Sequence, residues 1–256
     1  EINNRKKAII FALKNSSPNE IILIAGKGHE TYQDLGKKLI NLSDKNIIKK
    51  FKPLKNSSNQ NINELKFNSK ILKKVLNTKN NYSFSGISIN SKKIKNKNIF
   101  IAIKGKRYNG HNFSNEAIKN GARYCVVSKK IKNKKKMILV KNTFNFLNEF
   151  AKNFRNLSMS KFIAITGSSG KTTVKTMLGN LLNHYDNTFF SPYSFNNHFG
   201  VPLSICNMRS NHNYGVFEIG MNKPGEIFKL SSLVKPHFGV ITNISEAHLE
   251  NFKNIE

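Results

Sequence analysis

The sequence has little of what marks a secreted or membrane-embedded protein. Its 256 residues include two cysteines, Cys125 and Cys206. Both lie among apolar residues, which predicts reduced core thiols in a cytosolic protein rather than a disulfide framework. No apolar run approaches the length of a membrane span, and no signal peptide is recognisable. The composition therefore favours a cytoplasmic protein.

Acidic residues are also scarce. The chain has 14 Asp and Glu against 43 Lys and Arg, which gives a formal net charge of +29. Such an excess ordinarily suggests nucleic acid or an anionic surface as a partner. Here the lysines are spread along the whole chain beside abundant Asn and Ile, as a compositional bias would produce. The densest cluster, residues 129–136, lies between two predicted strands, and a solvated loop is favoured there over a polyanion site.

Both ends of the chain look cut. It begins with Glu1 rather than Met, opens directly into a helical pattern, and stops at Glu256 without a closing element. The hydrophobic content of 38% is low but sufficient for a core. The length accommodates one large domain or two ordinary ones.

One stretch organises the rest of the chain, and it is KFIAITGSSGKTT at residues 161–173. An apolar, β-branched run ends at Gly167-Ser168-Ser169-Gly170, and Lys171-Thr172-Thr173 opens a helical pattern. Strand, glycine loop, Lys-Thr and helix form the layout of a phosphate-binding loop. In that layout the backbone N–H groups and the helix N-terminus bind phosphate oxygens. Lys171 would reach the β- and γ-phosphates, and the Thr172 hydroxyl would hold Mg²⁺.

The match to the longer loop pattern is partial, because Ile165 stands where the first glycine is expected. The alternative is an ordinary Gly/Ser turn followed by a cationic helix start. A lysine early in a helix opposes the helix dipole, so that alternative needs another reason for Lys171. Nucleotide phosphate binding is the favoured interpretation.

Two further residues are candidate metal ligands. Glu218 lies towards the carboxyl end of the predicted strand 216–220, where a buried carboxylate is costly unless it is paired or metal-bound. It is the natural second Mg²⁺ ligand beside Thr172, since Mg²⁺ prefers oxygen, and a structural salt bridge is the alternative. His248 follows the predicted strand 238–243 and could bind a second metal or none.

The remaining pattern predicts an α/β fold with parallel strands and helices on both faces. Further strands are expected at residues 20–25, 85–89, 98–103, 124–127 and 137–140. Ser114 and Thr143 are the expected N-caps of two helices, and Gly121 is the expected end of the first. The second helix should bury Phe144, Leu147, Phe150, Ala151 and Phe154. The helix after the phosphate loop should bury Val174, Met177, Leu178, Leu181 and Leu182.

Four motifs follow one another in the second half of the chain: TGSSGKTT, SFNNHFGVP, FEIGMNKPGEI and TNISEAHLE. Their order and spacing resemble those of the central, ATP-binding domain of the Mur ligase family. Residues 88–113 resemble its N-terminal, UDP-binding domain. The family pattern of that domain is matched by Ser91, Phe100, Ala102, Gly105, His111 and Phe113. Asn90 stands where the family usually has Asp, and Lys92 where it has Arg, which makes two-pronged contacts that Lys does not.

The resemblance implies a role for each matched residue. Residues Gly167, Ser168, Ser169, Gly170, Lys171, Thr172 and Thr173 would hold ATP, and Lys171 would stabilise the transferred phosphoryl group. Thr172 and Glu218 would bind one Mg²⁺ and His248 a second, so that Lys171, Glu218 and His248 form the catalytic set. Ser91, Gly105, His111, Asn196 and Asn197 would lie near the substrate.

The first 55 residues resemble a different branch of the same family. AGKGHETYQ at residues 25–33 is similar to the C-terminal tail of the branch that adds the third peptide residue, diaminopimelate or lysine. In that branch, residues matching Gly26 and Glu30 contact the incoming amino acid. From the residues alone, His29 and Glu30 could equally be ligand contacts or polar loop groups. The tail alone is not expected to bind an amino acid, because the family's Asn-Pro-Arg motif is absent.

The domain organisation follows from these resemblances. Residues 1–51 would be a partial C-terminal domain, 52–64 a linker without periodic structure, 65–157 a UDP-MurNAc-binding domain, and 158–256 a truncated ATP-binding domain. The motif versions resemble the branch that joins D-alanyl-D-alanine to UDP-MurNAc-tripeptide through an acyl phosphate. The resemblance implies a cytoplasmic, monomeric bacterial ligase. This chain would be an incomplete part of it and should not catalyse ligation by itself.

Three alternatives remain open at this point. The chain could span the join of two fused ligases. Its specificity could instead be that of the third-residue branch or of folylpolyglutamate synthase, although a UDP-binding domain argues against the latter. A basic phosphate-loop protein that binds nucleic acid is the alternative from another class, and the lack of aromatic residues interleaved with basic ones on the predicted strands disfavours it.

Overall fold

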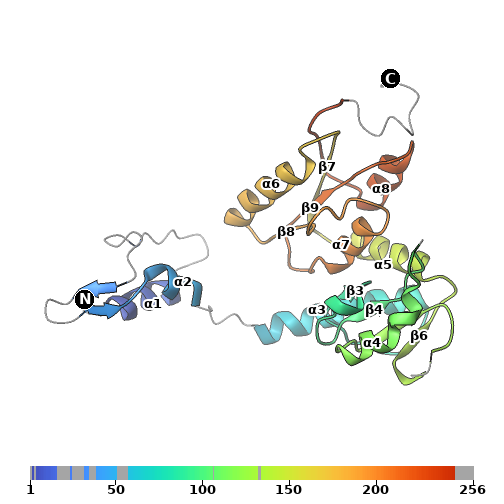
Figure 1. The fold of residues 1–256 in the computed structure, drawn as a ribbon, viewed down its shortest axis with the longest axis horizontal. Helices are drawn as coiled ribbons and strands as arrows, with labels where there is room; N and C mark the ends of the chain where they lie inside the picture. Colours follow the sequence, from blue (N-terminus) through green and yellow to red (C-terminus); the bar gives the residue numbers. More distant parts are fainter. Residues whose placement is uncertain are drawn as a thin grey trace. The chain divides into compact units, whose positions relative to one another are not determined.

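The computed structural model describes residues 2, 4–15, 24, 32–34, 39–50, 57–105, 107–131 and 134–245. They form two compact units, residues 1–60 and 61–256, each of which is described by itself. The fold is α/β with parallel sheets in the larger unit, as the sequence predicts (Figure 1).

The smaller unit holds two helices and one hairpin among its described residues. They are α1 (Arg5–Asn15), β1 (Tyr32–Asp34), β2 (Leu39–Asn41) and α2 (Asp44–Lys50), with β1 and β2 antiparallel. Arg5 joins the helices through a two-pronged contact, Nε to Asp44 Oδ1 at 3.0 Å and Nη2 to Oδ2 at 2.6 Å. The predicted strand 20–25 and the glycine loop with Gly26, His29 and Glu30 lie almost wholly outside the described residues.

Helix α3 (Ser57–Leu76), most of which belongs to the larger unit, precedes a four-stranded parallel sheet. Its strands are β3 (Ile87–Ser88), β4 (Ile99–Ile101), β5 (Tyr124–Val127) and β6 (Met137–Leu139), in that spatial order. The 3₁₀ turns η1 (Ser91–Lys93), η2 (Gly110–Phe113) and η3 (Lys134–Lys136) and helix α4 (Ser114–Lys119) connect them. We call this sheet with its helices the first sheet domain.

A second four-stranded parallel sheet follows helix α5 (Thr143–Leu157). Its elements are β7 (Lys161–Thr166), α6 (Lys171–Tyr185), β8 (Thr188–Phe190), α7 (Gly200–Asn207), β9 (Tyr214–Glu218), α8 (Glu226–Val234) and β10 (Phe238–Ile241). The strand order is β10-β7-β9-β8. β7 therefore lies in the interior of the sheet, and its carboxyl end is next to those of β9 and β10. We call this sheet with its helices the second sheet domain.

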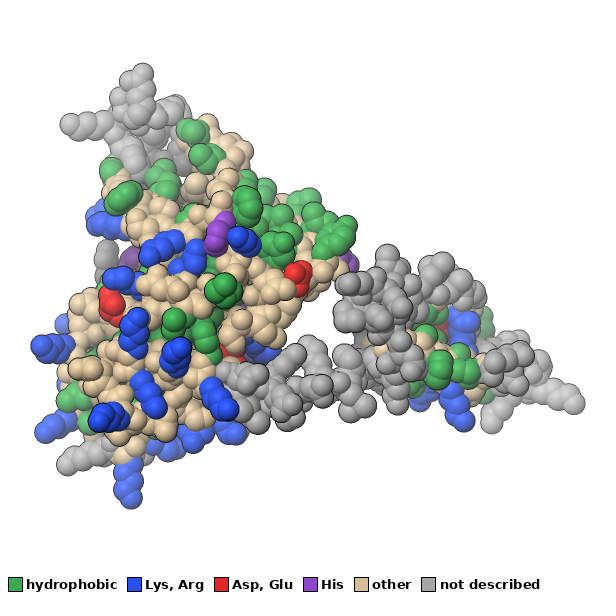
Figure 2. Space-filling model, turned by 180° about the vertical axis from the view of Figure 1, so that it is seen from behind, with side chains coloured by type: hydrophobic (Ala, Val, Ile, Leu, Met, Phe, Trp, Pro, Cys, Tyr) green, Lys and Arg blue, Asp and Glu red, His purple; other side chains and the backbone are tan. Residues whose placement is uncertain are grey.

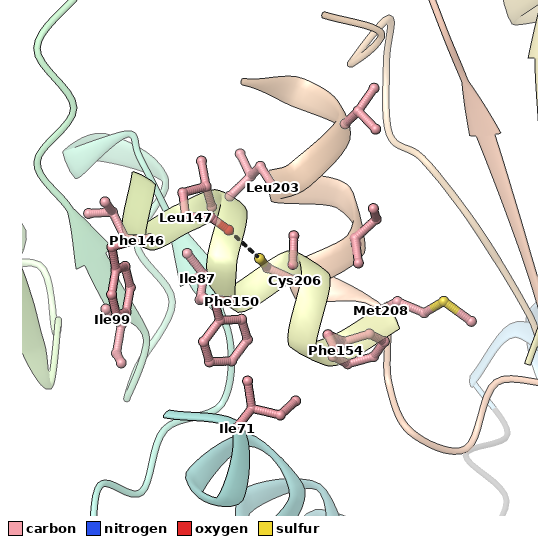
Figure 3. Close-up of a cluster of buried hydrophobic side chains, with 14 of the residues drawn as sticks. Ile71, Ile87, Ile99, Phe146, Leu147, Phe150, Phe154, Leu203, Cys206 and Met208 are labelled. Carbon is pink, nitrogen blue, oxygen red and sulfur yellow. Dashed lines mark hydrogen bonds between the residues drawn. The ribbon is translucent and has the colours of Figure 1, made fainter. Parts of the chain in front are cut away.

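One hydrophobic core runs through both sheet domains, and α5 is central to it. Phe150 and Phe154 are fully buried, and the core continues on one side to Ile71 of α3 and on the other to α7 (Figure 3). The α7 residue Asn207 adds a polar joint, because its side-chain amide donates to Ile87 O at 2.8 Å and accepts from Ile87 N at 3.0 Å. The amide thus pairs with β3 as a neighbouring strand would.

Both cysteines are buried free thiols, as predicted. Cys206 lies against α5, where its Sγ faces the Leu147 carbonyl at 3.8 Å (Figure 3). Burial raises the pKa of Cys125 to about 11 and that of Cys206 well above its usual range. Neither thiol is therefore a reactive nucleophile at neutral pH.

Three local predictions are wrong. Residues 57–64 belong to helix α3 rather than to a linker without periodic structure. Ser114 is not an N-cap, because η2 runs directly into α4 and the cap position is Phe113. Thr143 is the first residue of α5, and Asn142 caps it by accepting from Asn145 N at 2.9 Å. The Thr143 hydroxyl instead donates to Ala102 O at 2.9 Å. Gly121, with φ +101°, does follow the end of α4 as expected.

The buried face of α6 also differs from the prediction. Val174, Leu178 and Leu182 pack against the sheet, whereas Met177 and Leu181 are 67% and 55% exposed. The buried positions between them are Lys175 and Gly179. Gly179 lies against the Phe190 ring, where a Cβ would come within 2.5 Å of it. The helix therefore turns a small residue and a lysine inward because β8 and β9 lie close on that side.

The surface agrees with a dispersed positive charge. Figure 2 shows Lys and Arg side chains scattered over one face, with few acidic side chains among them. Among the described residues, no helix combines the length and the apolar character needed to cross a lipid bilayer.

Candidate nucleotide and metal site

The turn after β7 has the backbone shape of a phosphate-binding loop. Gly167 and Gly170 have φ of +135° and +75°, which favour glycine. At Gly167 space is limiting too, since a Cβ would lie 2.1 Å from Thr242 Oγ1. At Gly170 nothing lies within 4 Å, so only the conformation calls for glycine there.

The end of β10 braces this loop. Ser168 N donates to Asn243 O at 3.0 Å, and Ser169 N donates to Asn243 Oδ1 at 2.9 Å. Thr242 Oγ1 donates to Ser169 O at 2.6 Å. Thr242 and Asn243 had no predicted role. The sequence feature that could have indicated this role is a pair of polar residues at the carboxyl end of a strand. In a parallel sheet that end lies beside the loop that follows the neighbouring strand.

The N-terminus of α6 faces the same loop. The N–H groups of Lys171, Thr172 and Thr173 have no partner within the helix, and the cap residue Gly170 offers no side chain to them. These groups are the donors with which such a loop binds an anion. Lys171 Nζ lies across the loop and donates to the carbonyls of Gly167 at 2.6 Å and Ser168 at 3.0 Å.

Glu218 lies at the end of β9 next to this helix start and is 1% exposed. Its Oε2 accepts from Thr172 Oγ1 at 2.8 Å and from Lys175 Nζ at 3.2 Å. Its Oε1 accepts from Asn196 Nδ2 at 2.9 Å. Both readings of Glu218 thus have support, because it is salt-bridged to Lys175 and also adjacent to Thr172.

The oxygen pair fits a magnesium ion. Mg²⁺ binds oxygen at about 2.0–2.1 Å in an octahedron, so adjacent ligands lie about 2.9 Å apart. Thr172 Oγ1 and Glu218 Oε2 are 2.8 Å apart. His248, the predicted ligand of a second metal, lies outside the described residues. Within those residues, no group of three His, Cys, Asp or Glu side chains could hold a metal by itself.

A cavity of about 1040 Å³ opens beside the loop. It lies between the start of α5 and helix α8, and the loop forms part of its wall. Its lining includes Gly167, Ser168, Lys171, Asn196, Asn197, Phe144, His198 and Leu230. Phe144, predicted as core, is only partly buried and makes edge contacts with His198 and Phe199. The loop lysine and both predicted asparagines are therefore brought together at one cavity.

The two asparagines also serve the protein itself. Asn196 holds Glu218 through its side chain, and its carbonyl accepts from Gly220 N at 2.8 Å. Asn197 Oδ1 accepts from Phe199 N at 3.0 Å and from Gly200 N at 2.9 Å, just before and at the first residue of α7. Their substrate contacts stay predictions.

The three predicted substrate residues of the first sheet domain do not line this cavity. Ser91 Oγ donates to Glu116 Oε2 at 2.8 Å. Gly105 lies in a turn, where its N donates to Tyr108 O at 2.9 Å. His111 uses both ring nitrogens inside its domain, with Nε2 accepting from Ser128 N at 2.9 Å and Nδ1 lying 2.8 Å from Asn109 Oδ1. Burial, and then the charge of Lys129, lowers the pKa of His111.

The side chain of Asn90 has a local structural role. Its Oδ1 accepts from Lys92 N at 2.9 Å and caps η1. No hydrogen bond in the described part of the chain involves the side chain of Lys92, so the role of that position in binding stays a prediction.

The fold and this site define a class, which is an α/β nucleotide-binding protein with a phosphate-loop domain joined to a second parallel-sheet domain. The Mur ligase middle domain matches residues 165–256, and the catalytic domain of the Mur ligase family matches residues 83–155. Over these residues the chain belongs to the Mur ligase family. Neither match reaches residues 1–55, whose resemblance to the third-residue branch stays a prediction.

Relatives narrow the similarity to one branch. The chain is 42% identical over 194 residues to UDP-N-acetylmuramoyl-tripeptide–D-alanyl-D-alanine ligase of Rickettsia prowazekii, covering 74% of this chain and 43% of the relative. It is 34% identical to the enzyme of the same name from Escherichia coli, covering 61% of this chain and 35% of the relative. The chain thus spans less than half of these relatives.

Solved structures agree. A MurF structure from Acinetobacter baumannii matches 73% of this chain and 42% of its own with a TM-score of 0.65 and 32% identity. A MurF structure from Thermotoga maritima in complex with ADP matches 66% of this chain and 40% of its own with a TM-score of 0.58 and 35% identity.

Proposed function

We propose that this chain is part of an ATP-dependent UDP-N-acetylmuramoyl-tripeptide–D-alanyl-D-alanine ligase of peptidoglycan synthesis. The observation that carries the proposal is the glycine loop whose Lys171 lines a cavity, while the next residue, Thr172, is hydrogen-bonded to Glu218. The names of the relatives support the substrates. The cytoplasmic location and the monomeric state implied by the family resemblance are part of the same proposal.

The residues divide the work of binding ATP. The N–H groups at the start of α6 would hold phosphate oxygens, and Lys171 would leave the loop carbonyls to contact the terminal phosphates. Thr172 and Glu218 would hold Mg²⁺, which supplies charge neutralisation when it is bound. Gly167, Ser168 and Lys171 line the cavity together.

The cavity is the proposed place of the acceptor carboxylate. Asn197 and Lys171 both line it, so a carboxylate there would face the terminal phosphate. Attack of its oxygen on phosphorus releases ADP and yields an acyl phosphate. Attack of the D-alanyl-D-alanine amine on the acyl carbon then forms the amide and releases phosphate. Ser91, Gly105 and His111 are proposed to lie on the UDP side of the substrate, and His248 is proposed as ligand of a second metal.

The test uses the protein encoded by the whole open reading frame. With ATP, UDP-MurNAc-tripeptide and D-alanyl-D-alanine we expect phosphate release and a pentapeptide product. In the matched control, UDP-MurNAc-dipeptide takes the place of UDP-MurNAc-tripeptide, and diaminopimelate or lysine takes the place of D-alanyl-D-alanine. A product only in that control would overturn the assignment in favour of the third-residue branch. The 256-residue chain alone should bind ATP without forming product.

A further inference from the structure

Lys175 is a buried cation that the assignments above do not use. It lies one turn beyond Lys171 on α6 and is 1% exposed. A lysine is almost never buried to this extent unless it is paired, because removing its charge from water is costly. No other Lys or Arg side chain among the described residues with an assigned burial is classed as buried. Its position therefore calls for a specific explanation.

The ammonium group of Lys175 connects three segments. It donates to Glu218 Oε2 at 3.2 Å, at the end of β9. It also donates to the carbonyl of Tyr193, in the connection between β8 and α7. Tyr193 has a φ of +50°, which is uncommon for a residue other than glycine. The lysine thus holds a left-handed turn whose next residues lead to Asn196 and Asn197.

Both carboxylate oxygens of Glu218 are held by contacts that involve Lys175 or the segment that it anchors. Lys175 and Thr172 donate to Oε2, while Asn196 donates to Oε1 from the segment that Lys175 anchors at Tyr193. The carboxylate is therefore fixed before any ligand arrives. A fixed set of ligands binds a metal more tightly than one that must first be ordered.

We propose that Lys175 is a positioning residue for the metal–nucleotide site, holding Glu218 Oε2 against Thr172 and, through the Tyr193 carbonyl, the segment that carries Asn196. The inference rests on the proposed function, since nucleotide and Mg²⁺ define that site. It deepens that function because Lys175 is not itself a lining residue of the cavity and its side-chain ammonium bonds to Glu218 and Tyr193 instead.

The experiment measures ATP affinity of the 256-residue chain by calorimetry, in excess EDTA and in saturating Mg²⁺. The ratio of the two dissociation constants is the magnesium enhancement. In Lys175→Met, which keeps the length without the charge, we expect the enhancement to fall at least tenfold. The matched control is Lys161→Met, an exposed lysine at the start of β7, which should keep the wild-type enhancement.

A purely structural salt bridge predicts something different. It would lower the thermal midpoint of Lys175→Met but leave the enhancement unchanged in the folded protein. An enhancement that rises would also overturn the proposal, because it would mean that the ammonium repels the metal more than it orders Glu218. If Lys175→Met does not fold, Lys175→Gln keeps a donor without the charge, and it should lower the enhancement at least threefold. An unchanged value there would overturn the proposal.

A second pair of variants separates stability from positioning. Glu218→Gln should abolish most of the enhancement, and adding Lys175→Met to it should cause no further loss. The double variant should melt at a higher temperature than Lys175→Met alone, because removing both charges leaves none unpaired. Further loss of enhancement in the double variant would show that Lys175 does not act through Glu218. A wild-type chain that binds no ATP would overturn the proposed function itself, and this inference with it.

Discussion

The two sheet domains share an architecture but use their polar residues differently. Each has four parallel strands, and each has a glycine in the turn after an inner strand, Gly105 after β4 and Gly167 after β7. In the first sheet domain the candidate side chains of Ser91 and His111 bond within their own domain. In the second, Lys171, Asn196 and Asn197 face a cavity next to Glu218. Candidate residues in both domains make internal hydrogen bonds, but only those of the second sheet domain also line this cavity.

The largest expected difference between the domains concerns their post-strand lysines. Lys171→Met should weaken ATP binding by about 10- to 100-fold, because a charge-assisted hydrogen bond contributes about 1.5–3 kcal/mol. Lys104→Met, which changes the lysine after β4, should alter ATP affinity less than about twofold because that residue lies in the other domain. Calorimetric titration measures both. Equal losses would mean that ATP binds through general positive charge rather than at the loop.

The glycines give the next largest contrast. Gly167→Ala places a Cβ 2.1 Å from Thr242 Oγ1 at a φ of +135°, so the loop and β10 must separate. We expect a loss of stability of about 2 kcal/mol or more, together with weaker ATP binding. Gly105→Ala meets Tyr108 O at 3.4 Å, an ordinary contact, and should cost much less. Denaturant unfolding measures the difference, and similar losses would contradict the close packing of the loop.

Histidines provide a pH-dependent contrast. Ring nitrogens of His111, His212 and His237 accept backbone N–H groups, from Ser128, Arg209 and Phe162 respectively. Burial lowers the pKa of each ring. The unfolded chain therefore takes up protons first as the pH falls, and stability is lost below about pH 6.5, the ordinary value for histidine.

His111→Gln should reduce this pH dependence. The thermal midpoint of the wild-type chain should fall between pH 7 and pH 5, and the variant should lose less over the same range. His184→Gln, at an exposed position on α6, is the matched control and should behave as wild type. A variant that loses as much as wild type would mean that His111 titrates in the folded protein as it does in the unfolded chain.

Much of the fold followed from local pattern. The strand–loop–helix at residues 161–173 was recognisable because an apolar run, two glycines and Lys-Thr stand in sequence order. Strand β5 was predicted to the residue. The predictions of N-caps at Ser114 and Thr143 were wrong. A 3₁₀ turn runs directly into the first helix, and Asn142 caps the second, and composition reveals neither.

The parts of the site that could not be predicted from the sequence are those that depend on tertiary contacts. Glu218 was recognisable as a costly carboxylate at a strand end, but its partner was not. Lys175 looks like any helix lysine, and only the closeness of β8 and β9 turns it inward. Asn243 likewise braces the loop only because β10 pairs with β7. The roles of such residues become visible only in the folded structure. Their partners are distant in the sequence, and no periodic pattern connects them.

The smallest predicted effect concerns Asn90, which stands where relatives of the first sheet domain are expected to have Asp. Asn90→Ala removes the cap of η1 and should cost about 0.5–1 kcal/mol, as the loss of a weak cap does. Asn90→Asp keeps the acceptor for Lys92 N and should leave stability within about 0.5 kcal/mol of wild type. Denaturant unfolding and UDP binding are measured on both variants. Tighter UDP binding by Asn90→Asp at unchanged stability would contradict a purely capping role, because the carboxylate keeps the capping acceptor and differs only in its charge and in the loss of the amide donor. The first sheet domain would then hold a ligand-binding residue that its internal hydrogen bonds conceal.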